Sequence, residues 1–521
     1  MEEQSQGAQS AVNPWIVAIS VMFATFMEVM DTTVVNVSLP HIAGSLSASV
    51  NEATWTLTSY LVSNAIVLPM TGWLANYFGR KRLLMMSVTG FTVASFMCGL
   101  APSLPVLVIF RVIQGAAGGT LQPISQAILL EAFRPQDRGK AMAFWGLGIV
   151  VAPIMGPVLG GYLTDQYSWR WVFYINIPVG IASLIMTKAF VFDPSYIGQS
   201  RKRIDYWGLG MLAVGMGALQ ILLDKGQDKD WFQSHLITAL AIIAFGAIVI
   251  LIIRELRTRD PIIDLTVFKK RTYSAGVFLM TTLGFVLYGS LVLVPILMQT
   301  ILGYSAFEAG IAMAPRGFGS FLAMPAVGVL VGRFDPRKLL AIGFGLGALS
   351  LYQLSVLNMN AGYWDFFWPQ FIQGVGLALL FVPLTTTTMA PIANRNMGNA
   401  TSIFNLLRNI GGSMGIAAAT TYTVRSEQQL VNVLGQHVNP YSLNSQLTTD
   451  QIQSYLASQG SDPFTAADQA HGILFGIVQQ QAALISFLQA FLLLGILFLC
   501  MLPVLFVLKK PEEGKGAPPM H

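Results

Sequence analysis

The sequence predicts an all-α integral membrane protein that crosses the bilayer many times. Hydrophobic residues make up 54% of the 521 residues and charged residues only 11%, against about 25% charged in a soluble domain. The apolar residues also occur in runs of the length that spans a hydrocarbon core of about 30 Å, which takes about 20 helical residues. A water-soluble fold is excluded, because it could not bury this much apolar surface.

Fourteen such runs are long enough to cross the membrane, and each predicts one helix. Glycine and proline interrupt several of them, which membrane helices tolerate when neighbouring groups satisfy the freed backbone. The predicted spans cover residues of about 15–40, 52–77, 83–101, 105–128, 140–163, 171–192, 206–223, 236–253, 273–298, 308–331, 338–357, 365–390, 400–424 and 484–508.

The basic residues between the spans predict the orientation. If the N-terminus is cytoplasmic, the segments on that side hold 22 of the 30 lysines and arginines, whereas the opposite loops hold only Arg170, Lys225, Lys229 and Arg425. Positive charge is enriched in cytoplasmic loops, so we predict that both termini are cytoplasmic. This orientation also explains the net charge of +5, and no nucleic-acid partner is expected.

Two segments recur at nearly the same spacing and predict duplicated halves. Residues 72–84 (GWLANYFGRKRLL) resemble residues 328–340 (GVLVGRFDPRKLL), and Ile113-Gln-Gly115 matches Ile372-Gln-Gly374. The offsets are 256 and 259 positions. Repeated halves are common in transport proteins, so we predict two six-helix bundles with two inserted helices between them. The predicted parts are residues 1–192, 193–272 and 273–521.

Five motifs carry a resemblance to a known family. They are Asp31–Pro40 (DTTVVNVSLP), Gly72–Arg82, Arg111–Gly115 (RVIQG), Gly156–Gly161 (GPVLGG) and Trp169–Pro178 (WRWVFYINIP). Together they resemble the 14-span drug:proton antiporters of the major facilitator superfamily, of the EmrB/QacA type, and the similarity runs across nearly the whole chain. The resemblance implies the major facilitator fold, with the proton gradient as energy source and no cofactor. One departure is Asn76, where the family usually has an acidic residue, which puts a gating ion pair at this loop in question.

Five charged side chains lie well inside the predicted spans, namely Glu28, Asp31, Arg111, Arg316 and Arg408. A charge at such a depth costs at least about 2.5–3.5 kcal/mol and usually faces a cavity. Glu28 and Asp31 are three residues apart and share a helix face, and a carboxylate that binds and releases a proton is what proton coupling requires. We predict proton coupling at Asp31, which falls in the first motif, together with Glu28. The alternative is that arginines pair with both carboxylates permanently and only hold helices together.

Arg111 stays protonated and is expected to bias a nearby carboxylate towards ionisation. A structural hydrogen bond to backbone carbonyls is the alternative, although the second half has Gln370 at the equivalent position. For Arg316 and Arg408, close packing beside glycines is as good an interpretation as a place in the cavity. The residues predicted to line a substrate cavity are Asn36, Trp55, Arg316, Asn405 and Arg408.

The span at 140–163 carries small residues at every fourth position, a pattern that allows close helix contact. Two prolines remove backbone hydrogen bonds and should bend this span. The motif resembles the one that marks exporters within the superfamily, so the resemblance implies antiport and disfavours a proton-coupled importer. The predicted conformational motifs are Gly148, Ala152, Pro153, Gly156, Pro157 and Gly160, together with Gly72, Gly79 and Arg80.

A hairpin loop of about 60 residues, 425–483, is predicted on the outer side. Thr448-Thr-Asp-Gln451 resembles a capping box that opens a short helix ending near Gly460, and a second helix is expected to start near Thr465 and to run into the last span. Loops of this length are usually functional or disordered. The resemblance implies docking of a periplasmic adaptor protein with an outer-membrane channel, and a solvated hairpin without a partner is the alternative.

Other classes of function lack their sequence signatures. There is no Walker A sequence, the five histidines show no metal spacing, and no clustered nucleophile and base suggest a catalytic triad. We therefore expect no metal site and no enzyme, and an intramembrane enzyme is the disfavoured rival. The expected function is proton-coupled export of lipophilic small-molecule drugs across the bacterial cytoplasmic (inner) membrane, with transport of one specific metabolite as the alternative.

Overall fold

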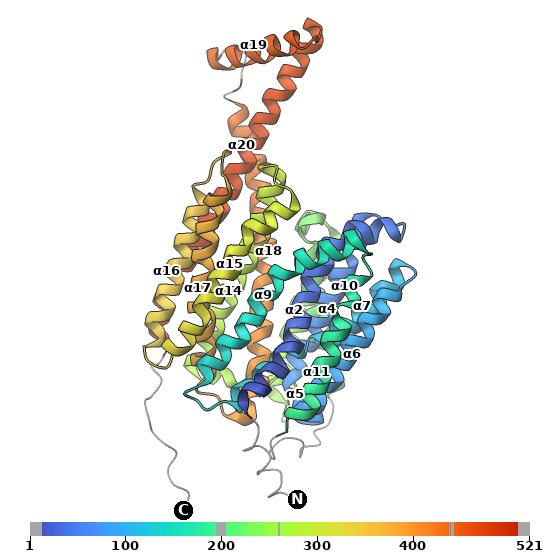
Figure 1. Ribbon diagram of the computed structural model, residues 1–521, viewed down its shortest axis with the longest axis vertical. Coiled ribbons are helices and arrows are strands. Elements are labelled where there is room, and N and C mark those ends of the chain that lie inside the picture. Colours follow the sequence, from blue (N-terminus) through green and yellow to red (C-terminus); the bar gives the residue numbers. More distant parts are fainter. Residues whose placement is uncertain (1–12, 194–204, 259–260, 437, 439–441, 509–521) are drawn as a thin grey trace, which may run out of the picture.

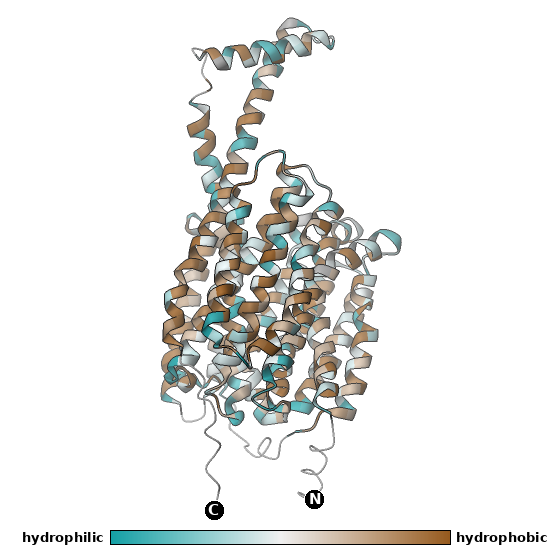
Figure 2. Ribbon diagram, turned by 60° about the vertical axis from the view of Figure 1, so that its left-hand side comes forward, coloured by the Kyte–Doolittle hydropathy of each residue, from teal (hydrophilic) through white to brown (hydrophobic). Residues whose placement is uncertain are grey.

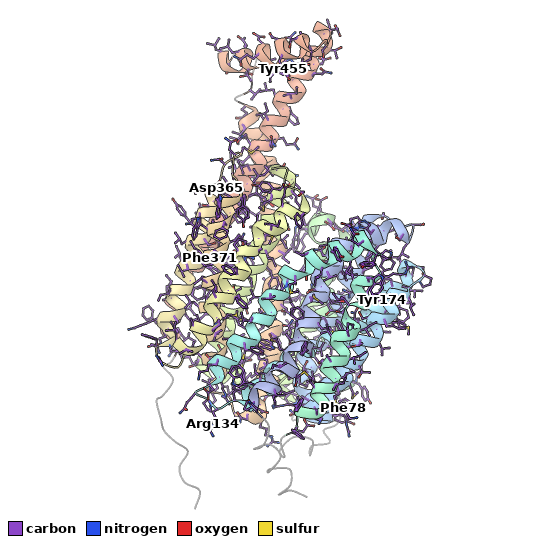
Figure 3. All side chains as sticks on the ribbon, in the orientation of Figure 1. Phe78, Arg134, Tyr174, Asp365, Phe371 and Tyr455 are labelled. Atoms are coloured by element: carbon purple, nitrogen blue, oxygen red, sulfur yellow. The ribbon has the colours of Figure 1, made fainter. Side chains whose placement is uncertain are left out.

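A computed structural model describes residues 13–193, 205–258, 261–436, 438 and 442–508. The described residues form helices and no strand, and most helices run side by side in one bundle (Figure 1). We call the end of the bundle that carries Phe78 and Arg134 the base, and the end that carries Tyr455 the hairpin end (Figure 3). The first long helix starts at the base (Figure 1).

The first half of the chain forms one group of packed helices. Its elements are α2 (Pro14–Ser45), α3 (Val50–Ala53), α4 (Trp55–Val67), η1 (Leu68–Met70), α5 (Thr71–Phe78), α6 (Arg80–Leu100), α7 (Leu104–Gly118), α8 (Leu121–Ala132), α9 (Arg138–Gln166), α10 (Trp171–Tyr174) and α11 (Asn176–Phe190).

The second half forms another group, preceded by two inserted helices. The inserted helices are α12 (Tyr206–Lys225) and α13 (His235–Arg257), with short turns at η2 (Gln227–Lys229), η3 (Trp231–Gln233) and η4 (Leu265–Lys269). The second half contains α14 (Arg271–Ile296), η5 (Leu297–Ile301), α15 (Ala306–Leu330), α16 (Pro336–Ser355), α17 (Tyr363–Met389), η6 (Asn394–Asn396), α18 (Met397–Gly435), α19 (Leu443–Ser458), α20 (Pro463–Cys500) and η7 (Leu502–Val507).

Length and hydropathy identify ten helices of the described chain as able to cross a membrane, or eleven with the bent helix α9. The count of fourteen spans is therefore not confirmed, although helices occupy the three remaining predicted ranges: α4 with α5, α15, and α18. Helix α18 illustrates why hydropathy alone misses such a helix. Its first turns bury polar side chains, including Thr401, Asn405 and Arg408, inside the protein rather than exposing apolar ones to lipid.

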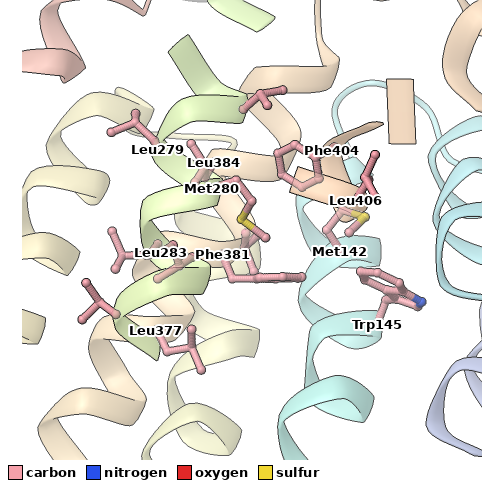
Figure 4. Packing of buried hydrophobic residues seen from close by; sticks show 14 of the residues in the cluster. Met142, Trp145, Leu279, Met280, Leu283, Leu377, Phe381, Leu384, Phe404 and Leu406 are labelled. Carbon is pink, nitrogen blue, oxygen red and sulfur yellow. The ribbon is translucent and has the colours of Figure 1, made fainter. Parts of the chain in front are cut away.

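The interior is apolar and is shared between the halves. Met142 and Trp145 of α9 lie beside Phe381 of α17 (Figure 4), and the rings of Trp145 and Phe381 stack with centroids 6.0 Å apart. Apolar residues also dominate the whole bundle (Figure 2). Helix α13 is the least buried of the described helices that are long and apolar enough to cross a membrane.

The two halves meet closely at the base. A Cβ atom on Gly72 of α5 would lie 2.6 Å from the Cα atom of Asn399 in α18, and one on Gly139 of α9 would lie 2.9 Å from the carbonyl oxygen of Gly328 in α15. Only glycine permits such backbone approach. The structure is thus closed between the halves at the base.

Helix α12 and the turn that follows it are bonded to both halves. On one side, Thr58 Oγ1 donates to the Asp224 carboxylate and Lys225 Nζ donates to Thr54 Oγ1 over 2.8 Å. On the other side, Gln220 Nε2 donates to Ser413 Oγ over 3.2 Å and Trp231 Nε1 donates to Thr421 Oγ1 over 2.9 Å, both on α18. The inserted helix therefore connects the halves along one edge.

The expected loop at 425–483 is wrong in form at its start, because α18 continues as a helix to Gly435, whereas the expected helix that runs into the last span is α20. Helix α18 has 39 residues and α20 has 38, or about 57 Å each at 1.5 Å per residue, which far exceeds the hydrocarbon core. Both project beyond the bundle, and α19 closes the hairpin (Figure 1). Helix α19 begins at Leu443 rather than near Thr448, whereas its end before Gly460 (φ 97°) and the start of α20 at Pro463 agree with the prediction.

Candidate functional site

Asp31 lies in the middle of α2 and has no exposed surface. Arg111 Nη1 of α7 pairs with its Oδ2 at 2.5 Å, while Gln114 Nε2 and Asn176 Nδ2 donate to its Oδ1 over 2.9 and 2.8 Å. One carboxylate thus connects α2, α7 and α11. Each of these three partners is a donor, so this cage fits an ionised carboxylate, and a proton on Oδ2 would meet the donor of Arg111.

Arg111 is held in place by groups other than Asp31. Its Nε donates to the carbonyl of Thr56 over 2.9 Å, its Nη1 also donates to Gln114 Oε1 over 2.8 Å, and its guanidinium lies 4.2 Å from the ring centroid of Tyr60. The two interpretations of Arg111 are therefore both present in the geometry, because it pairs with a carboxylate and also bonds a backbone carbonyl.

Glu28, one turn away on α2, is 5% exposed and lies in a second polar cluster. Asn64 Nδ2 donates to its Oε1 over 3.2 Å and Gln122 Nε2 donates to its Oε2. The other side-chain atom of Gln122, Oε1, accepts from Arg408 Nη2 of α18. A glutamine of the first half therefore bridges a carboxylate of its own half and an arginine of the second half.

The other predicted cavity residues divide into two groups. Asn405 is fully buried and donates to Gln126 Oε1 over 2.6 Å, so it lies on the same interface between the halves as Arg408. Asn36 is exposed, and Trp55 is 42% exposed with Lys225 6.0 Å from its ring centroid. The structure does not bring Asn36 and Trp55 together with the buried set.

The small-residue stripe of α9 packs against α2 as the spacing predicts. A Cβ atom on Gly156 would lie 2.0 Å from Thr33 Oγ1, one on Gly160 would lie 2.8 Å from the carbonyl oxygen of Val34, and one on Gly148 would lie 3.0 Å from Met22 Cγ. Ala152 is fully buried. The axis of α9 bends by 42° between Pro153 and Val158; the side chain of Pro157 lies outside the described part.

The motif between α5 and α6 forms a polar contact at the base. Gly79 adopts a φ of 87°, which favours glycine, and Lys81 N donates to Asp193 Oδ1 over 2.8 Å. Arg80 is 1% exposed, forms an ion pair with Glu131 of α8, and donates to the carbonyl of Asn394 in the second half over 3.2 Å. Arg80 thus has an acidic partner although Asn76 is not acidic.

Comparisons with known proteins identify the family. The model of the Major Facilitator Superfamily matches residues 21–416. The chain belongs to the major facilitator superfamily. Among curated relatives, the Multidrug export protein EmrB of Escherichia coli (strain K12) is 37% identical over 519 residues, which is 99% of each chain. The Fatty acid resistance protein FarB of Neisseria gonorrhoeae is 37% identical over 509 residues, 98% of each chain.

Solved structures of the same superfamily share the fold. The human organic anion transporter MFSD10 has a TM-score of 0.58 at 12% identity, over 93% of this chain and 99% of its own. The proton:xylose symporter XylE has a TM-score of 0.56 at 15% identity, over 90% of this chain and 94% of its own. The expected major facilitator fold is therefore confirmed.

The sequence analysis did not predict the amide side chains that hydrogen-bond Asp31 and Glu28. Gln114 lies three residues after Arg111 and Asn176 lies in the motif at 169–178, so a search for amides inside motif-bearing spans would have found both. Gln122 had no such signal, because its bridging role depends on α18, which is distant in sequence.

A cavity of about 720 Å³ lies near the hairpin end, between α12, α14, α18 and α20. Its walls include Trp231, Phe285, Arg425 and Gln489, and none of the residues of the carboxylate cages lines it. Its volume is within the usual range for small-molecule pockets. Within the described chain, no group of three or more His, Cys, Asp or Glu side chains is placed to hold a metal ion.

Proposed function

We propose that this chain exports lipophilic small organic compounds across the bacterial cytoplasmic membrane in exchange for protons. The observation that carries the proposal is the ion pair of Asp31 and Arg111, which has no exposed surface and lies within a bundle of apolar helices. A charged pair at this depth is expensive and is usually kept for transport of ions or substrates. The relatives named for multidrug export and fatty acid resistance support a lipophilic cargo.

In the proposed cycle, a proton from outside binds Asp31 or Glu28 and cargo leaves in exchange. Protonation of Asp31 removes the charge that holds Arg111, and protonation of Glu28 weakens the bridge through Gln122 to Arg408. Either change alters contacts within or between the halves, so proton binding can bias their rocking motion. The proton gradient is the proposed energy source, and transport rather than catalysis is the proposed activity.

The proposed orientation places the base in the cytoplasm. Arg80, Lys81, Arg134 and Arg138 all lie at or near this end, which agrees with the enrichment of positive charge in cytoplasmic loops. The hairpin then projects into the periplasm. It carries exposed apolar side chains, among them Phe464 (85% exposed) and Phe475 (59% exposed), and we propose that it docks a periplasmic adaptor protein linked to an outer-membrane channel.

The first experiment measures cargo-driven proton movement in reconstituted vesicles. Candidate lipophilic cations, anions and neutral compounds are added against a set pH gradient, with the native chain, Asp31→Asn and Glu28→Gln. Asp137→Asn is the matched control, because Asp137 is an exposed carboxylate paired with Lys140 at the base. We expect counter-directed proton flux that Asp31→Asn abolishes and the control preserves. Flux in the same direction as the cargo contradicts export.

A second experiment tests the adaptor. A variant in which residues 436–462 are replaced by a short turn is expected to keep proton-coupled transport in vesicles, which have a single membrane. The same variant should lose drug resistance in cells with two membranes. Unchanged resistance in those cells would contradict a docking role for the hairpin.

A further inference from the structure

Arg316 of α15 is a buried cation that has no acidic partner among the described residues. The residue is 4% exposed, and its Nη2 donates to Ser290 Oγ over 3.2 Å and to Gln373 Oε1. Its Nε and Nη1 have no hydrogen-bond partner among the described residues. Burial of a charged group with unused donors is unfavourable unless a further group supplies the missing contacts.

The other two arginines inside the spans have such compensation. Arg111 pairs directly with Asp31, and Arg408 reaches Glu28 through the amide of Gln122. Among the described residues, the hydrogen-bond partners of Arg316 are a hydroxyl and an amide, both neutral. The second half therefore holds an unbalanced positive charge at this point.

The internal repeat shows that this cluster is the counterpart of the Asp31 cage. At an offset of 259, Asp31 corresponds to Ser290 and Gln114 corresponds to Gln373. Equivalent glycines also make equivalent close contacts in the two halves. A Cβ atom on Gly115 would lie 2.3 Å from the carbonyl oxygen of Tyr60 in α4. One on its equivalent, Gly374, would lie 2.0 Å from the carbonyl oxygen of Arg316.

The counterpart cage has no carboxylate and carries its cation on a different helix. Ser290 stands in place of the acid, and Arg316 stands in place of Tyr60, the residue whose ring lies against Arg111, at the other repeat offset of 256. Gln370, which replaces Arg111, is fully buried, and neither its side-chain oxygen nor its side-chain nitrogen has a hydrogen-bond partner among the described residues. Gln370 and Gln373 are three residues apart on α17 and share a helix face.

Three nitrogen donors on two neighbouring helices have no partner among the described residues: Nε and Nη1 of Arg316, and Nε2 of Gln370. A guanidinium fork matches the two oxygens of a carboxylate, and a charge-assisted pair of this kind is stronger than neutral hydrogen bonds. Along α17 the site lies at the level of Phe371, which is in the part of the second half nearer to the hairpin end (Figure 3).

We propose that Arg316, Gln370, Gln373 and Ser290 form a binding site for the anionic oxygen group of a lipophilic carboxylate. The inference rests on the proposed function in one respect, since it takes this carboxylate to be cargo. The two halves then have complementary roles: the first half holds a carboxylate that exchanges a proton, and the second half holds a cation that selects an acidic cargo.

The test measures binding to the purified full-length chain in neutral detergent, without transport. The probes are decanoate, its neutral analogue decanamide, and sodium chloride as an inorganic anion, with thermal stabilisation as readout. The variants are Arg316→Gln and Gln370→Leu. Arg333→Gln is the matched control, because Arg333 is an exposed arginine just after α15, near the base.

We expect Arg316→Gln to weaken decanoate binding by about tenfold or more, as loss of a charge-assisted contact implies. Gln370→Leu, which keeps the charge, should weaken it by a smaller factor of about threefold. Decanamide should bind the native chain and both variants equally, which separates recognition of the anion from partition into the micelle, and Arg333→Gln should match the native chain.

Equal decanoate affinity of the native chain and Arg316→Gln would overturn the proposal. Arg316-dependent stabilisation by chloride without any by decanoate would also overturn it, since the site would then hold a free inorganic anion. If Arg316→Gln does not fold, Gln370→Leu decides, and unchanged decanoate affinity in that variant refutes the site. Proton flux driven by a neutral lipophile tests the proposed export separately, so it can succeed where this inference fails.

Discussion

Replacing either member of the Asp31–Arg111 pair should lower the stability of the protein more than replacing both. Both side chains have no exposed surface and meet at 2.5 Å. Loss of one partner leaves the other charge buried and uncompensated, which typically costs about 3–5 kcal/mol, whereas neutral replacements of both can be nearly harmless. Asp31 would keep the donors of Gln114 and Asn176, and Arg111 would keep its contact with the ring of Tyr60. These remaining contacts place the expected cost of each single variant near the lower limit, about 3 kcal/mol.

The assay is a double-mutant cycle with two readouts. Asp31→Asn, Arg111→Gln and the double variant are compared for thermal stability in detergent and for cargo-driven proton flux in vesicles. We expect both single variants to be destabilised, the double variant to recover at least half of the loss, and all three to lack coupled flux. Single variants as stable as the native chain would refute the ion pair as a structural element. Coupled flux in the double variant would refute its role in proton exchange.

Three further changes test other parts of the structure. Gly156→Ala places a methyl group 2.0 Å from a threonine hydroxyl of α2 and should lower the stability by about 1–3 kcal/mol in thermal-stability assays. Gly161→Ala on the same helix, with nothing within 4 Å, is the control and should leave the stability unchanged. Equal effects of the two variants would contradict the packing. Gln122→Leu separates a carboxylate from the arginine of α18 and should change the pH dependence of transport; an unchanged pH profile would show that the bridge takes no part. The Arg254 guanidinium hydrogen-bonds Asp205 and holds the pKa of that carboxyl below its usual range. The stability that this pair contributes is therefore complete above about pH 4 and is lost as the pH falls through the lowered pKa. Asp205→Asn should make the stability independent of pH in that window, and an unaltered profile would contradict the assignment.

The sequence was most informative where one residue type has few tolerated environments. Arg111 was expected to lie near a carboxylate because buried charges in a bilayer require partners, and the structure places it against Asp31. The glycines of α9 were expected to allow close packing because of their spacing of four residues, and they pack against α2. In both cases one local rule determines the contact, so no knowledge of distant helices is needed.

The parts that could not be predicted depend on contacts between distant segments. Amides such as Gln122 are tolerated in many settings, so its bridge to Arg408 follows only from the placement of α8 beside α18. The polar composition after Arg425 suggested a loop, yet α18 continues as a helix to Gly435, and it packs against α20, where Ser426 Oγ donates to Gln489 Oε1 over 2.9 Å. Hydropathy measures contact with lipid, and it underestimates helices such as α18 that bury polar side chains inside the protein.

The double attachment of α12 limits how the protein can open. Lys225 is bonded to one half and Trp231 to the other, so the halves cannot part along this edge without breaking those bonds. The halves must then rotate about an axis near α12, so the largest displacement occurs at the opposite edge of the bundle. There, α9 and α15 meet through Gly139 and Gly328 with bare backbone, a contact that can slide without breaking side-chain bonds. In the proposed export, a compound dissolved in the inner leaflet would therefore enter sideways between α9 and α15, without first passing through water.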